Sequence, residues 1–111
     1  MSDDAFIRVG SLSELPAGSC AAVDIEGREI LLCHTAEGIF ALDNLCTHGA
    51  ARLCEGKLRG SKIHCPLHGA AFDVRDGSAL SRPAVRGLAS HRVAVDGDDI
   101  AVALVTGRKS Q

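Results

Sequence analysis

Two short segments of the sequence resemble each other, Cys46-Thr47-His48-Gly49-Ala50-Ala51 and Cys65-Pro66-Leu67-His68-Gly69-Ala70-Ala71. Each half offers one Cys and one His, followed by Gly and two Ala. Two similar loops can meet face to face and present four ligands. A thiolate is a soft, anionic ligand that suits iron–sulfur or zinc, and imidazole is a neutral, borderline ligand. We therefore predict that Cys46, His48, Cys65 and His68 bind a metal centre.

The spacing within each half supports this prediction. One residue separates Cys46 from His48, and in an extended segment residues i and i+2 point to the same side. The Gly after each His lets the backbone turn and lets another segment approach closely. Two Cys and two His would also satisfy tetrahedral zinc, although zinc fingers usually keep Cys pairs and His pairs apart. A structural zinc module and a metal-free domain remain open as less favoured alternatives.

Short segments of alternating apolar and polar residues flank these two halves, separated by Gly and Asp turns. This pattern is typical of an all-β domain. Residues 44–80 differ, because they are rich in Gly, Cys and His, and function tends to lie on loops held by a rigid frame. We expect one antiparallel domain over residues 1–111 with a cluster-binding insert at about 44–80. The expected strands are residues 6–9, 22–26, 29–34, 38–42, 62–65, 71–74, 88–95 and 99–105, with at most one helical turn at 11–15.

Composition excludes several classes of function. The net charge of −2 is spread over the chain of 111 residues, without the basic stripe of a nucleic-acid binder. No apolar run approaches the ~18 residues of a membrane span. The odd count of five Cys and the acidic N-terminus favour a reducing, cytoplasmic location. We find no nucleophile–base set and no nucleotide motif, so we do not expect an enzyme on its own.

Cys-x-His, sixteen residues and then Cys-x-x-His is similar to the cluster motif of the Rieske proteins. The resemblance extends through Phe72-Asp73, the turn at Asp76-Gly77, Pro83-Ala84 and the closing hairpin. It implies an antiparallel β-sandwich with a small cluster-binding subdomain of two loops. It also implies one 2Fe–2S cluster, with Cys46 and Cys65 on one iron and His48 and His68 on the other. Two neutral imidazoles in place of thiolates raise the reduction potential above that of all-Cys clusters.

Four positions separate this chain from the Rieske proteins of respiratory cytochrome bc complexes. Those proteins carry a disulfide between the cluster loops, where this chain has Ala51 and Leu67, and hydroxyl donors to the cluster where it has Ala70 and Phe72. The chain is more similar to the soluble Rieske ferredoxins of bacterial ring-hydroxylating oxygenase systems. That resemblance implies a one-electron carrier between a flavoprotein ferredoxin reductase and a terminal Rieske oxygenase. The alternative is the small subunit of an NADH-dependent nitrite reductase.

The remaining Cys and His residues have weaker patterns. We expect Cys20, Cys33 and Cys54 to pack as small apolar side chains, because free Cys commonly does so. The three other histidines are expected to be solvated or partly packed, with His64 pointing away from the cluster. They are His34, His64 and His91. Pro66 and Leu67 are predicted to form part of an apolar rim where a redox partner docks.

Overall fold

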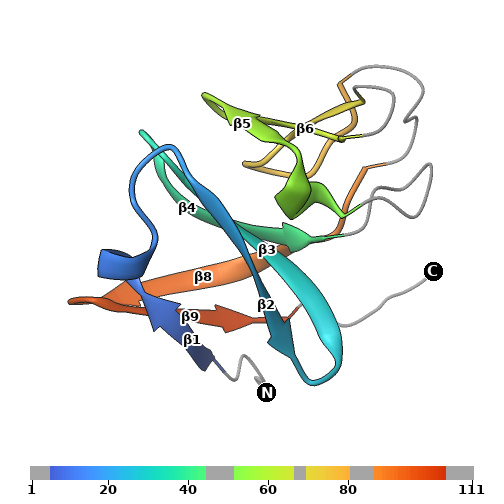
Figure 1. Cartoon of the computed structure of the whole chain (residues 1–111). Helices are drawn as coiled ribbons and strands as arrows, with labels where there is room; N and C mark the ends of the chain where they lie inside the picture. Colours follow the sequence, from blue (N-terminus) through green and yellow to red (C-terminus); the bar gives the residue numbers. More distant parts are fainter. Residues whose placement is uncertain (1–5, 45–51, 67–69, 81–86, 105–111) are drawn as a thin grey trace.

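The computed structural model describes residues 6–44, 52–66, 70–80 and 87–104 of the chain (Figure 1). Almost all regular structure in these ranges is β-strand, and all strand pairs are antiparallel. No helix of the described ranges is long and apolar enough to cross a membrane. In chain order the elements are β1 (Ile7–Ser11), the 3-10 turn η1 (Leu12–Glu14), β2 (Cys20–Ile25), β3 (Arg28–Thr35), β4 (Gly38–Asp43), the 3-10 turn η2 (Leu53–Glu55), β5 (Lys57–Arg59), β6 (Lys62–His64), β7 (Ala71–Asp73), β8 (Ser90–Asp96) and β9 (Asp99–Ala103).

The larger sheet has six strands in the order β1-β9-β8-β4-β3-β2. Its hairpin of β2 and β3 turns on Glu26 and Gly27, whose φ angles of 54° and 87° are both left-handed. Two left-handed residues are what a two-residue hairpin needs, because that geometry matches the right-handed twist of the strands. The Asp24 carboxylate accepts a hydrogen bond from the Gly27 N–H at 3.1 Å. The turn therefore lies one residue earlier than expected, because the strands predicted at 22–26 and 29–34 would leave Gly27 and Arg28 between them.

The smaller sheet has three strands in the order β5-β6-β7 and comes entirely from the insert at 44–80. Figure 1 shows it standing against the end of the larger sheet, close to β3 and β4. A buried apolar cluster joins the two sheets, with Leu31 and Leu42 from the larger sheet and Ile63 and Phe72 from the smaller. Among the described residues, Phe72 has the largest side chain that is fully buried. The smaller sheet is thus packed rigidly on the larger one.

The all-β prediction is confirmed, and all eight expected strands are present with their ends shifted by a few residues. The short helical turn expected at 11–15 is η1. Strand β5 was not expected, because Lys57 and Arg59 leave Leu58 as its only apolar residue. Leu58 packs against the buried cluster while the two cations stay exposed, so pairing with β6 creates this strand.

Candidate metal centre

The predicted ligand Cys65 lies directly after strand β6, with 3% of its surface exposed. Cys46, His48 and His68 lie outside the described residues. Cys65 forms no disulfide. A buried thiolate is costly in an apolar setting unless a cation compensates its charge. Its burial within the cluster that joins the two sheets therefore fits a metal ligand.

The stem of the second predicted cluster loop is closed by one backbone hydrogen bond. The Cys65 N–H donates to the Ala70 carbonyl oxygen at 2.7 Å. Immediately outside this bond, His64 pairs with Ala71, which continues the ladder between β6 and β7. Ala70 is fully buried. Cys65 and Ala70, on either side of the predicted loop, are thus held together at the end of the β6–β7 ladder.

The stem of the first predicted loop is closed by Asn44, which is fully buried. Its Oδ1 accepts a hydrogen bond from the Cys54 N–H at 2.9 Å, and its Nδ2 lies 3.4 Å from Cys54 Sγ. The Asn44 carbonyl oxygen also accepts from the Leu53 N–H at 2.7 Å. Asn44 therefore clamps the chain just before residues 45–51 to the chain just after them.

Glu29 on β3 supports this clamp from the larger sheet. Its carboxylate accepts from Asn44 Nδ2 at 3.1 Å and from Arg52 Nη2 at 2.7 Å, and its backbone oxygen accepts from the Asn44 N–H. The hydrogen bonds from Asn44 and then Arg52 lower the pKa of Glu29 below its usual value. Glu29 is thus an anion that holds Asn44 and Arg52, the residues at the two ends of the first loop.

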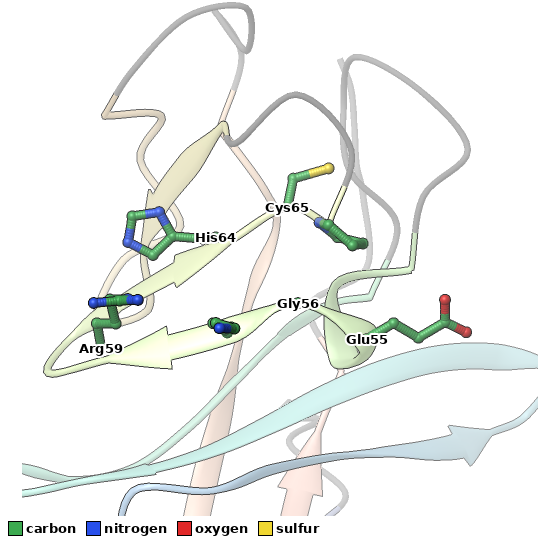
Figure 2. A pocket seen from close by; sticks show the side chains of 7 residues that line it. Glu55, Gly56, Arg59, His64 and Cys65 are labelled. Atoms are coloured by element: carbon green, nitrogen blue, oxygen red, sulfur yellow. The ribbon is translucent and has the colours of Figure 1, made fainter.

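A surface hollow of about 430 Å³ opens beside Cys65. Figure 2 shows Gly56 and Arg59 at the two ends of β5, and His64 and Cys65 along the neighbouring strand. A methyl group on Gly56 would overlap the His64 carbonyl oxygen, so only glycine permits this close approach beside the ligand. The lining residues are Glu55, Gly56, Lys57, Arg59, His64, Cys65 and Pro66. Its walls therefore carry more positive than negative charge.

The other histidines are partly buried at His34 and His64, as expected, and buried at His91. His91 on β8 is 7% exposed, and its Nε2 lies 2.9 Å from Asp43 Oδ1 on β4. Burial of Asp43 would raise its pKa, but the hydrogen bond with His91 and the charge of Arg28 outweigh that effect and lower it. His34 Nδ1 lies 2.7 Å from the Leu15 carbonyl oxygen. His91 thus links β8 to β4, His34 links β3 to the turn after η1, and His64 lines the hollow.

Asn44 is the functional residue that sequence reasoning missed. An Asn at the end of an apolar strand, directly before a ligand loop, is a signal that was available. Its role also depends on Glu29 and Cys54, whose proximity no local pattern reveals. Cys54 packs against the buried apolar cluster, as expected, and its Sγ also accepts a long hydrogen bond from Asn44. The expected apolar rim is described only at Pro66, which is exposed.

Comparison with known proteins places these features in a family. The model of the Rieske [2Fe-2S] domain matches residues 5–103. The ferredoxin component of the naphthalene 1,2-dioxygenase system of Pseudomonas aeruginosa is 40% identical over 99 residues, covering 89% of this chain and 95% of that protein. The ferredoxin component of the naphthalene 1,2-dioxygenase and salicylate 5-hydroxylase systems of a Ralstonia species is 41% identical over 91 residues, covering 82% and 88%.

Solved structures agree with these relatives. The ferredoxin of carbazole 1,9a-dioxygenase from Nocardioides aromaticivorans superposes with a TM-score of 0.85 at 37% identity, covering 88% of this chain and 96% of that chain. A nitrite reductase small subunit from Mycobacterium tuberculosis superposes at 0.83 but is only 21% identical, covering 96% and 100%, which shows a shared fold alone. The chain belongs to the Rieske [2Fe–2S] domain family.

Proposed function

We propose that this chain is a one-electron carrier that serves the terminal oxygenase of an aromatic-ring dioxygenase system. The observation that carries the proposal is the identity of 40% to a naphthalene dioxygenase ferredoxin component, over 95% of that protein's length. A 2Fe–2S cluster, when bound, accepts and releases one electron, and the protein supplies its position and surroundings. We therefore propose a carrier and not an enzyme in its own right.

We propose Cys46, His48, Cys65 and His68 as the cluster ligands, as the motif predicts. The two closed loop stems support this assignment, because each begins or ends within two residues of a proposed Cys. Cys65 is buried and its N–H is held by Ala70, while Asn44 holds the chain beside the loop of Cys46. Donors on anchored loops keep their geometry when the cluster changes charge, and small rearrangement favours electron transfer.

The proposed partners are a flavoprotein ferredoxin reductase as donor and a terminal Rieske oxygenase as acceptor. A relative that is 31% identical, with a TM-score of 0.85, was solved as a complex of reduced oxygenase and oxidised ferredoxin in carbazole 1,9a-dioxygenase. We treat residues 1–111 as one domain and the cytoplasm as its compartment. Four described cysteines without a disulfide are consistent with a reducing environment.

The alternative of a nitrite reductase small subunit is less well supported. Two such subunits share the fold at 21% and 23% identity, well below the 37% of the carbazole dioxygenase ferredoxin. A structural zinc module conflicts with membership of a 2Fe–2S family.

Rapid mixing tests the proposal. The chemically reduced protein is mixed with an oxidised terminal oxygenase of an aromatic-ring dioxygenase system, and cluster oxidation is followed by visible absorbance. We expect second-order transfer of one electron per chain, with His64→Ala retaining the cluster spectrum and His68→Ala losing it. A protein that transfers electrons only inside a stable complex with a flavo-haem subunit would instead be a nitrite reductase component.

A further inference from the structure

Two cysteines outside the proposed cluster ligands lie opposite each other in the larger sheet. Cys20 is the first residue of β2, and Cys33 is its register partner on β3. The two-residue turn at Glu26 and Gly27 makes Ile25 and Arg28 the first hydrogen-bonded pair, and such pairs then alternate along the ladder. Counting outward from the turn, Cys20 and Cys33 occupy a non-hydrogen-bonded position.

A hydrogen bond just beyond the pair confirms this register. The His34 N–H donates to the Ser19 carbonyl oxygen at 3.0 Å, so Ser19 and His34, the residues next to the two cysteines, are bonded to each other. In non-hydrogen-bonded pairs the Cα atoms are about 4.5 Å apart and the side chains are at their closest. A disulfide accepts Cα separations of about 4.4 to 6.8 Å. Cys20 and Cys33 thus form a pair of the class whose typical backbone spacing a disulfide allows.

The two thiols differ in a way that suits stepwise exchange. Cys33 is fully buried, whereas Cys20 is partly exposed, and neither is in a disulfide. A hydrogen bond from Cys33 lowers the pKa of Cys20 to about 7, which outweighs its partial burial. The same hydrogen bond and burial raise the pKa of Cys33. Cys20 is therefore the more exposed of the two thiols and the one that loses its proton more easily.

We propose that Cys20 and Cys33 are a reversible dithiol–disulfide site, oxidised by small disulfides of the glutathione class. The Cys20 thiolate attacks one sulfur of the glutathione disulfide and expels one glutathione thiolate. Cys33 then loses its proton, attacks Cys20 Sγ and expels the second glutathione. Two protein thiols and one glutathione disulfide become one protein disulfide and two glutathione thiols. All electrons are accounted for without the cluster.

The site lies where a bond would stiffen the frame of the metal centre. Cys33 belongs to the buried cluster that also contains Cys65 and Phe72, and Cys20 packs against it. β2 is the end strand in the hydrogen-bonded order of the larger sheet. A disulfide would fasten this strand to β3 at the end away from their turn. We therefore expect oxidation to slow exchange of the β2 amides and to leave the cluster spectrum unchanged.

Peptide mapping of the intact, cluster-loaded protein tests the proposal. The protein is equilibrated over a series of oxidised-to-reduced glutathione ratios, quenched with N-ethylmaleimide and digested with trypsin. Oxidation should join the peptide of residues 9–28, which carries Cys20, to the peptide of residues 29–52, which carries Cys33. The joined fraction should rise with the ratio, fall again on adding dithiothreitol, and leave the visible spectrum unchanged.

Two variants make the result decisive. Cys54→Ser removes another thiol outside the proposed ligand set and should give the same titration as the wild type. Cys33→Ser should abolish the link and leave glutathione attached to Cys20. If both thiols remain fully alkylated at every ratio, or if the link joins Cys20 to Cys46 in the peptide 29–52, the proposal is wrong. Fragmentation of the linked peptides distinguishes Cys33 from Cys46.

Discussion

Replacing Asn44 with Ala should release the cluster faster, because Asn44 clamps the stem of the first ligand loop. The variant loses the hydrogen bonds to Glu29 and Cys54 and leaves the Cys54 N–H without its acceptor. Net hydrogen bonds contribute about 0.5–1.5 kcal/mol each, and an unsatisfied buried donor costs about 1–3 kcal/mol. The contact with Cys54 Sγ is long, so we take about 2–4 kcal/mol for the whole clamp.

This free energy converts directly into a rate. If the cluster leaves through local opening of the first loop, the open population follows the local opening free energy. With about 1.4 kcal/mol for each factor of ten, Asn44→Ala should release iron roughly 30 to 700 times faster. The assay follows loss of visible absorbance in excess iron chelator at neutral pH.

Cys54→Ala is the matched control, because it removes only the Sγ contact and keeps the backbone N–H bonded to Asn44 Oδ1. It should accelerate release by only about twofold, which corresponds to the low end of about 0.5 kcal/mol for one hydrogen bond. Asn44→Asp keeps an acceptor for the Cys54 N–H but places a second carboxylate beside Glu29. Its rate of iron release should therefore lie between those of Asn44→Ala and Cys54→Ala. Equal rates for Asn44→Ala and Cys54→Ala would refute the clamp.

Three further outcomes follow from the described residues. Ala70→Ser should raise the reduction potential if the new hydroxyl donates a hydrogen bond to a cluster sulfur. Each factor of ten in favour of the reduced state corresponds to about 60 mV. Ala71→Ser is the control and should leave the potential unchanged in protein-film voltammetry. Because the pKa of Asp43 is lower in the folded protein, the ionised carboxylate stabilises the fold at pH values above its pKa in the unfolded chain. This stabilisation is lost as the pH falls through the pKa in the folded protein. The stability difference between wild type and Asp43→Asn should therefore shrink below about pH 4 in urea titrations. Lys57→Glu should slow oxidation of the reduced protein by the anionic cobalt(III)–EDTA complex and speed its oxidation by the cationic hexaamminecobalt(III) complex. Both differences from the wild type should disappear at high salt.

Each of these three predictions would be contradicted by a specific result. Equal potentials for the two Ser variants would show that a hydroxyl at position 70 does not reach the cluster. A stability difference that stays constant from neutral to strongly acidic pH would remove Asp43 from the acid response. A Lys57→Glu change of the same sign with both cobalt complexes would show that the charge at position 57 does not steer small oxidants.

The strands of the larger sheet could be predicted from the sequence because their alternation is local. Their ends could not, since the turn at Glu26 uses a left-handed non-glycine residue that no pattern announces. Strand β5 was missed for a related reason. Leu58 is one apolar residue between two cations, and only its contact with the buried cluster makes it part of a sheet.

The ligand motif was readable because each Cys and His pair is close in sequence and the chemistry of the donors is distinctive. What holds the loops was not readable. Asn44, Glu29 and Arg52 meet through contacts that span up to 23 residues, and His91 reaches Asp43 across 48. Such polar contacts depend on the packed fold, whereas local spacing reports only which residues could share a loop.

Measuring iron, zinc and acid-labile sulfide in the purified chain shows whether it holds a 2Fe–2S cluster. We expect about two irons and two sulfides per chain, as for one 2Fe–2S cluster, and no stoichiometric zinc. One zinc per chain with no sulfide would contradict this expectation.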